Sequence, residues 1–194
     1  MNKSYLKILT LIAALLLFST TSHAAEHYQI DTKGMHASIN FKIKHLGYSW
    51  LKGRFEKFSG DFSYDAKQPS NSQVSVTIDT ASVNSNHAER DKHLRSDEFL
   101  DVKKYPTAAF KSQSVTAKAD GSLIIKGDFS LHGVKKTIEI HATKVGEGKD
   151  PWGGYRAGFS GTTRLKLADY GITYNLGPAS THVDLALEIE GIRQ

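Results

Sequence analysis

Apolar and polar residues alternate one by one along much of the chain, which is the pattern of β-strands that bury one face. The alternation is clear at Ile39, Phe41 and Ile43, which are separated by polar residues. It returns in five later groups of apolar positions: Val74, Val76, Ile78; Leu123, Ile125, Phe129; Ile138, Ile140; Phe159, Leu165; and Val183, Leu185, Leu187, Ile189. Together with segments 55–64 and 108–112, these groups predict an all-β protein of about eight strands.

Turn signals separate the predicted strands and indicate that neighbouring strands are antiparallel. They are Asp120-Gly121, His132-Gly133, Asp150-Pro151, Tyr170-Gly171 and Gly177-Pro178. Such a chain can close as a two-sheet sandwich or as a barrel. We favour the barrel because full closure removes the exposed edge strands that promote aggregation. Four glycines in or beside strands fit the bends of barrel strands: Gly53, Gly60, Gly127 and Gly161.

One segment departs from the strand pattern. Asn86 is a candidate N-cap with Glu89 three residues later, a pairing that resembles a capping box. We predict a short helix from about His87 to Leu94. A helix inserted in a barrel of this kind is expected at one mouth, as a lid or plug.

The predicted helix carries the densest group of charged side chains. On a helix, His87 would share a face with Asp91, and Glu89 would share a face with His93. The chain lacks the paired histidines of a zincin helix and has no cysteine, so a solvated helix with ion pairs is favoured and no metal site is predicted. The glycine-rich segment 146–154 lacks the Lys-Ser/Thr ending of a phosphate loop, and no Gly-x-Ser-x-Gly elbow is present. We therefore expect no cofactor and no enzymatic activity.

The first residues have the order of a signal peptide. Two lysines are followed by the uncharged run 8–18, and Ser22 and Ala24 supply the small residues that a cleavage site requires. The run has 11 residues, whereas a membrane-spanning helix needs about 20. We expect residues 1–24 to be removed after Ala24 and the protein to be exported to the periplasm.

The remaining residues, 25–194, are of a length that suits one domain. They carry a net charge of about +3 with no cluster of basic residues, so nucleic acid is not an expected partner. They contain no cysteine, so the fold must hold without disulfides. The polar faces of the strands carry charges that exclude an integral outer-membrane barrel: Lys42, Lys44, Glu139, Glu188 and Glu190.

The apolar faces of different strands must converge if the sheet closes, and ten residues are predicted to line the interior as ligand contacts. They are Ile39, Phe41, Ile43, Phe55, Phe62, Val76, Ile78, Phe110, Phe129 and Phe159. At about eight strands, a barrel interior is either filled by side chains or able to hold one slender ligand. The residue pattern leaves both alternatives open.

Four segments resemble a known family: His45-Leu46-Gly47-Tyr48-Ser49-Trp50, residues 86–110, Asp150-Pro151-Trp152-Gly153-Gly154 and Leu176-Gly177-Pro178-Ala179-Ser180. The chain is similar through these segments to the YceI-like, polyisoprenoid-binding proteins of bacterial periplasms. The resemblance implies a lipocalin-like barrel with a helical insertion, whose pore binds a long isoprenoid or a similar apolar lipid. It implies no established reaction.

Two other functions stay open beside the lipid carrier. One is an enzyme acting on such a lipid, with His87, Glu89 and His93 near the mouth. The other is a plugged barrel with a structural role. The sequence leaves both a monomer and a homodimer open.

Overall fold

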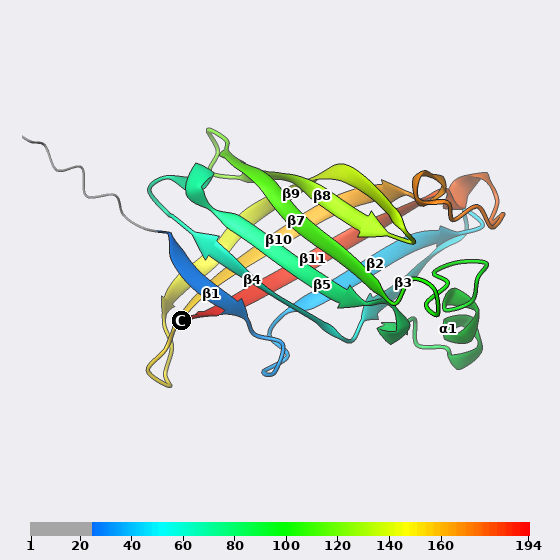
Figure 1. Ribbon diagram of the computed structural model, residues 1–194, viewed down its shortest axis with the longest axis horizontal. Helices are drawn as coiled ribbons and strands as arrows, with labels where there is room; N and C mark the ends of the chain where they lie inside the picture. The colour runs from blue at the N-terminus through cyan, green and yellow to red at the C-terminus, as the bar shows by residue number, and fades with distance from the viewer. Residues whose placement is uncertain (1–24) are drawn as a thin grey trace, which may run out of the picture.

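Eight antiparallel strands pair in a closed ring, as the alternating pattern predicts (Figure 1). In chain order they are β1 (Glu26–Ile30), β4 (Phe58–Tyr64), β5 (Gln73–Asp79), β7 (Thr107–Ala117), β8 (Leu123–Leu131), β9 (Val134–Lys149), β10 (Tyr155–Lys166) and β11 (His182–Arg193). Each pairs with the next, and β1 also pairs with β11, which closes the barrel. The computed structural model describes residues 25–194, so the predicted signal peptide and its cleavage after Ala24 lie outside the described residues.

Three further strands lengthen the barrel at one end: β2 (Ser38–His45), β3 (Ser49–Phe55) and β6 (Val83–Asn84). Strand β11 pairs with β1 through its last residues and with β2 through residues 183–188. Pairing along β11 is therefore interrupted between Ile30, at the end of β1, and Ser38, at the start of β2. Strand β3 continues the extension by pairing with both β2 and β6.

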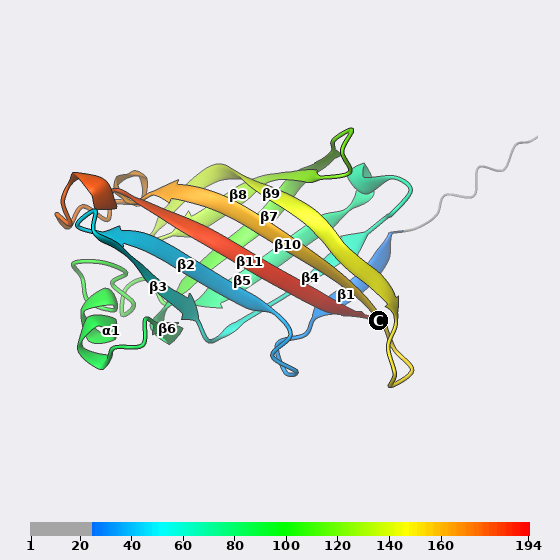
Figure 2. The ribbon, with the colours of Figure 1, turned by 180° about the vertical axis from the view of Figure 1, so that it is seen from behind.

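The helical insertion is α1 (Ala88–Leu94), which lies at the extended end of the barrel (Figure 2). The β2–β3 turn and the segment 167–181, with the 3-10 turns η3 (Leu167–Tyr170) and η4 (Pro178–Ser180), lie at the same end. We refer to the end that holds α1, the β2–β3 turn and segment 167–181 as the α1 end of the barrel. Two other 3-10 turns, η1 (Pro69–Asn71) and η2 (Thr80–Ser82), flank β5.

The predicted helix is confirmed, but its predicted N-cap is wrong. His87 is the cap, and its Nδ1 accepts a hydrogen bond from the Arg90 backbone N–H at 3.2 Å. An N-cap residue adopts extended backbone angles. His87 has a φ of −157°, whereas Asn86 has a φ of 62° and lies outside the helix.

Aromatic side chains fill the end of the barrel opposite α1. The rings of Tyr28 and Phe62 stack with centroids 4.9 Å apart. Phe159 meets Phe62 edge-on at 5.6 Å and Tyr64 at 5.0 Å. Such contacts add to the stabilisation from burying apolar area. Phe62, Tyr64 and Phe159 of this cluster form part of the interior wall near this end.

The predicted turns are all found, with two differences in the strands. Segment 55–64 was predicted as one strand, but Glu56 and Lys57 separate β3 from β4. Gly127 is not at a bulge of its own strand, because the register of β8 with β9 is continuous there. It lies opposite Ser112, where β7 has a bulge, and a Cβ on Gly127 would lie 2.7 Å from Phe110 Cζ. The glycine thus makes room for a buried ring.

Candidate functional site

The barrel interior holds two adjoining cavities. The smaller, about 120 Å³, lies within the closed ring, and the larger, about 310 Å³, lies between the ring, β2, β3 and α1. Four side chains line both cavities and mark where they adjoin: Ile39, Ile78, Phe129 and Leu185. The interior is therefore hollow along much of its length, and its walls are almost entirely apolar.

All ten residues predicted to line the interior lie on the walls of these cavities. Phe62, Val76, Phe110 and Phe159 line the smaller one. Phe41, Ile43 and Phe55 line the larger one. Ile39, Ile78 and Phe129 line both. That they contact a ligand stays a prediction.

The sequence analysis missed the part of the wall that comes from outside the strands. These side chains belong to α1, to the segment that follows it and to the segment after β10: Leu94, Phe99, Leu100, Leu167, Ile172 and Leu176. They show no two-residue period, because helix and loop backbones do not alternate their side chains between two faces. For Leu94, Phe99 and Leu100, an apolar character within a highly charged insertion was the one available signal.

Ionisable side chains reach the larger cavity at the α1 end, from His45, Arg90 and His93. Arg90 is held in place by Ser85, because its Nε donates to the serine Oγ at 2.7 Å. His93 Nε2 lies 2.5 Å from Glu98 Oε2, and its ring meets Phe99 edge-on. The polar groups of the smaller cavity are neutral: Ser63, Ser72, Gln73 and Thr163. The interior thus has a charged end and an apolar end.

The two side-chain pairs of α1 that were weighed as metal ligands do not converge. His87 caps the helix, and His93 pairs with Glu98. The buried Asp91 carboxylate accepts hydrogen bonds from the backbone N–H and the hydroxyl of Ser85. His87, Asp91 and His93 are therefore each engaged in a separate contact, and Glu89 is exposed.

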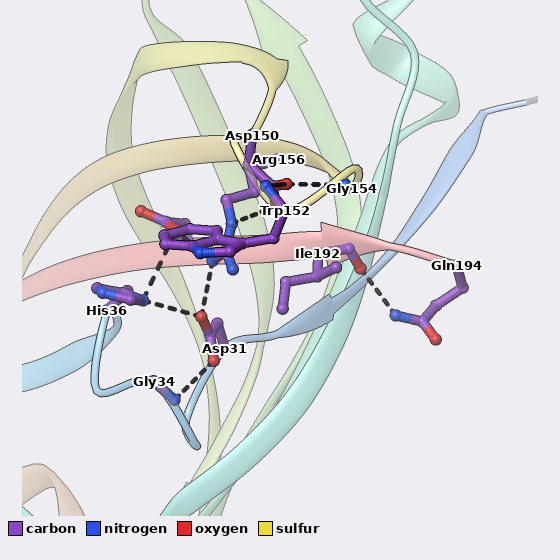
Figure 3. Close-up of polar contacts among 10 residues, drawn as sticks. Asp31, Gly34, His36, Asp150, Trp152, Gly154, Arg156, Ile192 and Gln194 are labelled. Atoms are coloured by element: carbon purple, nitrogen blue, oxygen red, sulfur yellow. Dashed lines mark hydrogen bonds and ion pairs between the residues drawn. The ribbon is translucent and has the colours of Figure 1, made fainter.

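Within residues 25–194, one set of three potential metal ligands lies close together, on the outside of the barrel: Asp31, His36 and Glu190. Figure 3 shows Asp31 and His36 of this set beside Arg156. A guanidinium already lies between the carboxylates of the set. Arg156 Nη1 donates to Asp31 Oδ2 at 2.7 Å and to Glu190 Oε1 at 2.6 Å. Its Nε donates to Asp150 Oδ2 at 2.8 Å. This arrangement is an ion-pair network that links the segment after β1 to β10 and β11.

The network predicts a loss of stability in acid. Hydrogen bonds from Arg156, and then from His36, hold the pKa of the Asp31 carboxyl at about 2, below its ordinary value of 3.8. A lowered pKa stabilises the folded state above the ordinary value, and the contribution disappears as the pH falls from about 4 to about 2. We expect a loss of about 1 to 2 kcal/mol, reduced by solvent screening near the surface. Urea unfolding across this range should show the slope, and Asp31→Asn should make it shallower; an unchanged slope would contradict the assignment.

A closed antiparallel barrel with a hollow apolar interior defines the class of barrels that enclose one small ligand, as lipocalins do. Residues 28–191 match the YceI-like domain family. The chain belongs to this family, as its resemblance predicted. Within residues 25–194, no helix is long and apolar enough to span a membrane.

Relatives and solved structures agree with the assignment. A UPF0312 protein of Ectopseudomonas mendocina is 58% identical over 94% of this chain and 97% of its own length. The crystal structure of a Campylobacter jejuni YCEI protein is 31% identical, with a TM-score of 0.68 over 78% of this chain and 90% of that one. A structure described as a polyisoprenoid binding domain from Saccharophagus degradans shares the fold at 17% identity, with a TM-score of 0.63 over 86% of this chain and 98% of that one.

Proposed function

We propose that the protein is exported to the periplasm, where it binds one long-chain isoprenoid or a similar apolar lipid inside the barrel. The observation that carries this proposal is the pair of adjoining apolar cavities, which meet at Ile39, Ile78, Phe129 and Leu185. Burial of a hydrocarbon chain gains roughly 0.8 kcal/mol per methylene before the costs of ordering and association. The description of the Saccharophagus degradans domain as polyisoprenoid binding supports the same ligand class.

The charge distribution of the interior supports one orientation of the proposed ligand. An ionised or strongly polar headgroup is costly to bury without partners. His45, Arg90 and His93 supply such partners at the α1 end, and the neutral smaller cavity suits the tail. We infer that the headgroup lies beside α1 and that the tail extends toward the aromatic cluster of Tyr28, Phe62 and Phe159.

A carrier fits these residues better than an enzyme acting on the same lipid. Of the three residues weighed for catalysis, His93 lines the larger cavity, whereas His87 and Glu89 are exposed on the helix. His93 is paired with Glu98, and Arg90 is bonded to Ser85. These contacts position polar groups for binding and leave no nucleophile beside a base on this part of the wall.

A bulky side chain where the cavities adjoin should shorten the ligand that the barrel accepts. Leu185 lines both cavities, so Leu185→Trp should block the smaller one. In a titration with fluorescent amphiphiles of increasing chain length, the native protein should bind longer chains more tightly. The variant should stop gaining affinity once the chain reaches the junction, with a loss of about tenfold for the longest chains.

Ala186→Trp is the matched control, because Ala186 is exposed on the same strand. It should keep the chain-length dependence of the native protein. If the native protein shows no dependence on chain length, or if both tryptophan variants bind alike, the proposed tail site is wrong.

A further inference from the structure

The β2–β3 turn lies at the α1 end of the barrel (Figure 2), and apolar side chains in and beside it are exposed. Leu46 is 54% exposed, Tyr48 is 89% exposed and Trp50 is 46% exposed. Tyr174, in the segment after η3, is a fourth large exposed apolar residue at this end, at 43%. Single exposed apolar residues are ordinary, but a cluster at one end marks an interaction surface.

The turn holds its leucine in a conformation that favours other residues. Leu46 has a φ of 52° and Gly47 a φ of 87°, and the Tyr48 N–H donates to the His45 carbonyl at 3.0 Å. Two-residue turns with positive φ favour Asn-Gly or Gly-Gly, because other side chains are strained there. An exposed leucine at this position is unfavourable in both backbone and solvation terms. Leu46 is nevertheless held in this conformation with more than half of its surface exposed.

Contacts with η4 fix the turn in place. Ser180 Oγ donates a hydrogen bond to the Lys44 carbonyl at 2.5 Å. A Cβ on Gly47 would lie 3.5 Å from Ala179 Cβ, so the turn packs directly against η4. The exposed side chains are therefore presented on a fixed support.

Basic side chains surround the exposed tryptophan. Lys42 Nζ lies 4.8 Å from the Trp50 ring centroid, and Lys44 Nζ lies 5.6 Å from it. Asp184 lies 4.0 Å from Lys42. Within residues 25–194, no carboxylate oxygen comes within 4.0 Å of the ammonium groups of Lys44 or Lys52. The outer face of the hairpin is therefore positively charged beside its apolar tip.

We propose that the β2–β3 turn docks the barrel onto an anionic phospholipid surface. Tryptophan and tyrosine favour the membrane–water interface, and each lysine near anionic headgroups adds attraction. His45 and Leu51, in the same hairpin, line the larger cavity. Docking through this turn brings the charged end of the cavity to the bilayer. A lipid can then enter or leave with little exposure to water. This surface goes beyond the proposed interior binding and is tested without any cargo.

The two tryptophans of the chain provide separate reporters. Trp50 lies at the docking turn, and Trp152 lies in the β9–β10 hairpin at the other end (Figure 1). With phosphatidylglycerol vesicles, Trp152→Phe protein, which retains Trp50, should show a blue shift in emission. Trp50→Phe protein, which retains Trp152, should show none. Phosphatidylcholine vesicles and high salt should weaken the first shift.

A pair of serine variants tests the same surface by vesicle flotation of the exported protein. Leu46→Ser with Tyr48→Ser should reduce partition onto phosphatidylglycerol vesicles about tenfold. Val145→Ser with Trp152→Ser removes two side chains of 72% and 76% exposure at the other end and should leave partition unchanged. Because the positions are exposed, both variants should stay folded, and thermal melting checks this.

Three results would overturn the proposal. The first is that the native protein does not float with the vesicles. The second is that both serine variants lose vesicle partition equally. The third is that the protein self-associates in solution and that the Leu46 and Tyr48 variant abolishes this self-association. The last result would make the turn an interface between copies. Because the vesicles contain no isoprenoid, failure here leaves the interior site untouched, and failure of the interior site leaves docking untouched.

Discussion

Phe129→Asp is expected to abolish retention of an apolar chain while the barrel stays folded. Phe129 is 5% exposed and lines both cavities, so a carboxylate there would face the ligand where the cavities adjoin. An unpaired carboxylate buried against hydrocarbon costs far more than the lost ring contact. We expect binding of long-chain amphiphiles to fall at least about a hundredfold.

The empty barrel should tolerate the same substitution, because the adjoining cavities give water access to the new group. In a filled core, loss of a phenylalanine side chain alone costs about 3 to 5 kcal/mol. Ser130→Asp is the matched control on the next residue of β8, and it should bind amphiphiles as the native protein does. Binding should be measured beside thermal melting for each variant. Outright unfolding of Phe129→Asp would indicate a packed interior and contradict the hollow barrel.

Gly191→Val is expected to cause a large loss of stability, in contrast to a valine at an unconstrained glycine. Gly191 pairs with Ile30 and with Ala157, at the step where β11 closes the ring. A Cβ there would lie 2.5 Å from Phe62 Cε1 and 2.8 Å from Tyr28 Cβ, inside the stacked pair. Overpacking costs typically about 1 to 3 kcal/mol, and two rings in contact cannot both move aside. We expect a melting temperature lower by roughly 5 to 10 °C.

Gly146→Val tests whether this effect comes from the contact or from the loss of a glycine. Gly146 lies in β9, and nothing lies within 4 Å of a Cβ built on it. Its melting temperature should stay close to that of the native protein. Melting should be monitored by circular dichroism. Equal decreases in melting temperature for the two variants would mean that the aromatic cluster does not depend on the space at Gly191.

The sequence predicts the barrel and much of its wall because both depend on a local period. Alternation at Ile39, Phe41 and Ile43 places these side chains on one face of a strand wherever that strand pairs. Closure then brings such faces together, so the ten interior residues follow from the pattern. The helix of the insertion follows from its capping residues, with an error of one position at His87.

Other features depend on contacts between distant segments, which a local period does not encode. Strand β11 pairs with both β1 and β2, and this split cannot be seen in either short segment. Arg156 reaches Asp31 across 125 positions of the chain. A filled and a hollow barrel also share one alternating pattern, because the volume left inside depends on how all the strands close together.

Organic extraction of the protein purified from its native host, followed by mass spectrometry, tests the central claim most directly. The claim is that the hollow interior holds one long apolar chain. We expect a single class of long-chain lipid at close to one molecule per barrel, retained by Ser130→Asp and absent from Phe129→Asp. Native protein without extractable lipid, which also fails to take up long-chain amphiphiles, would contradict the account.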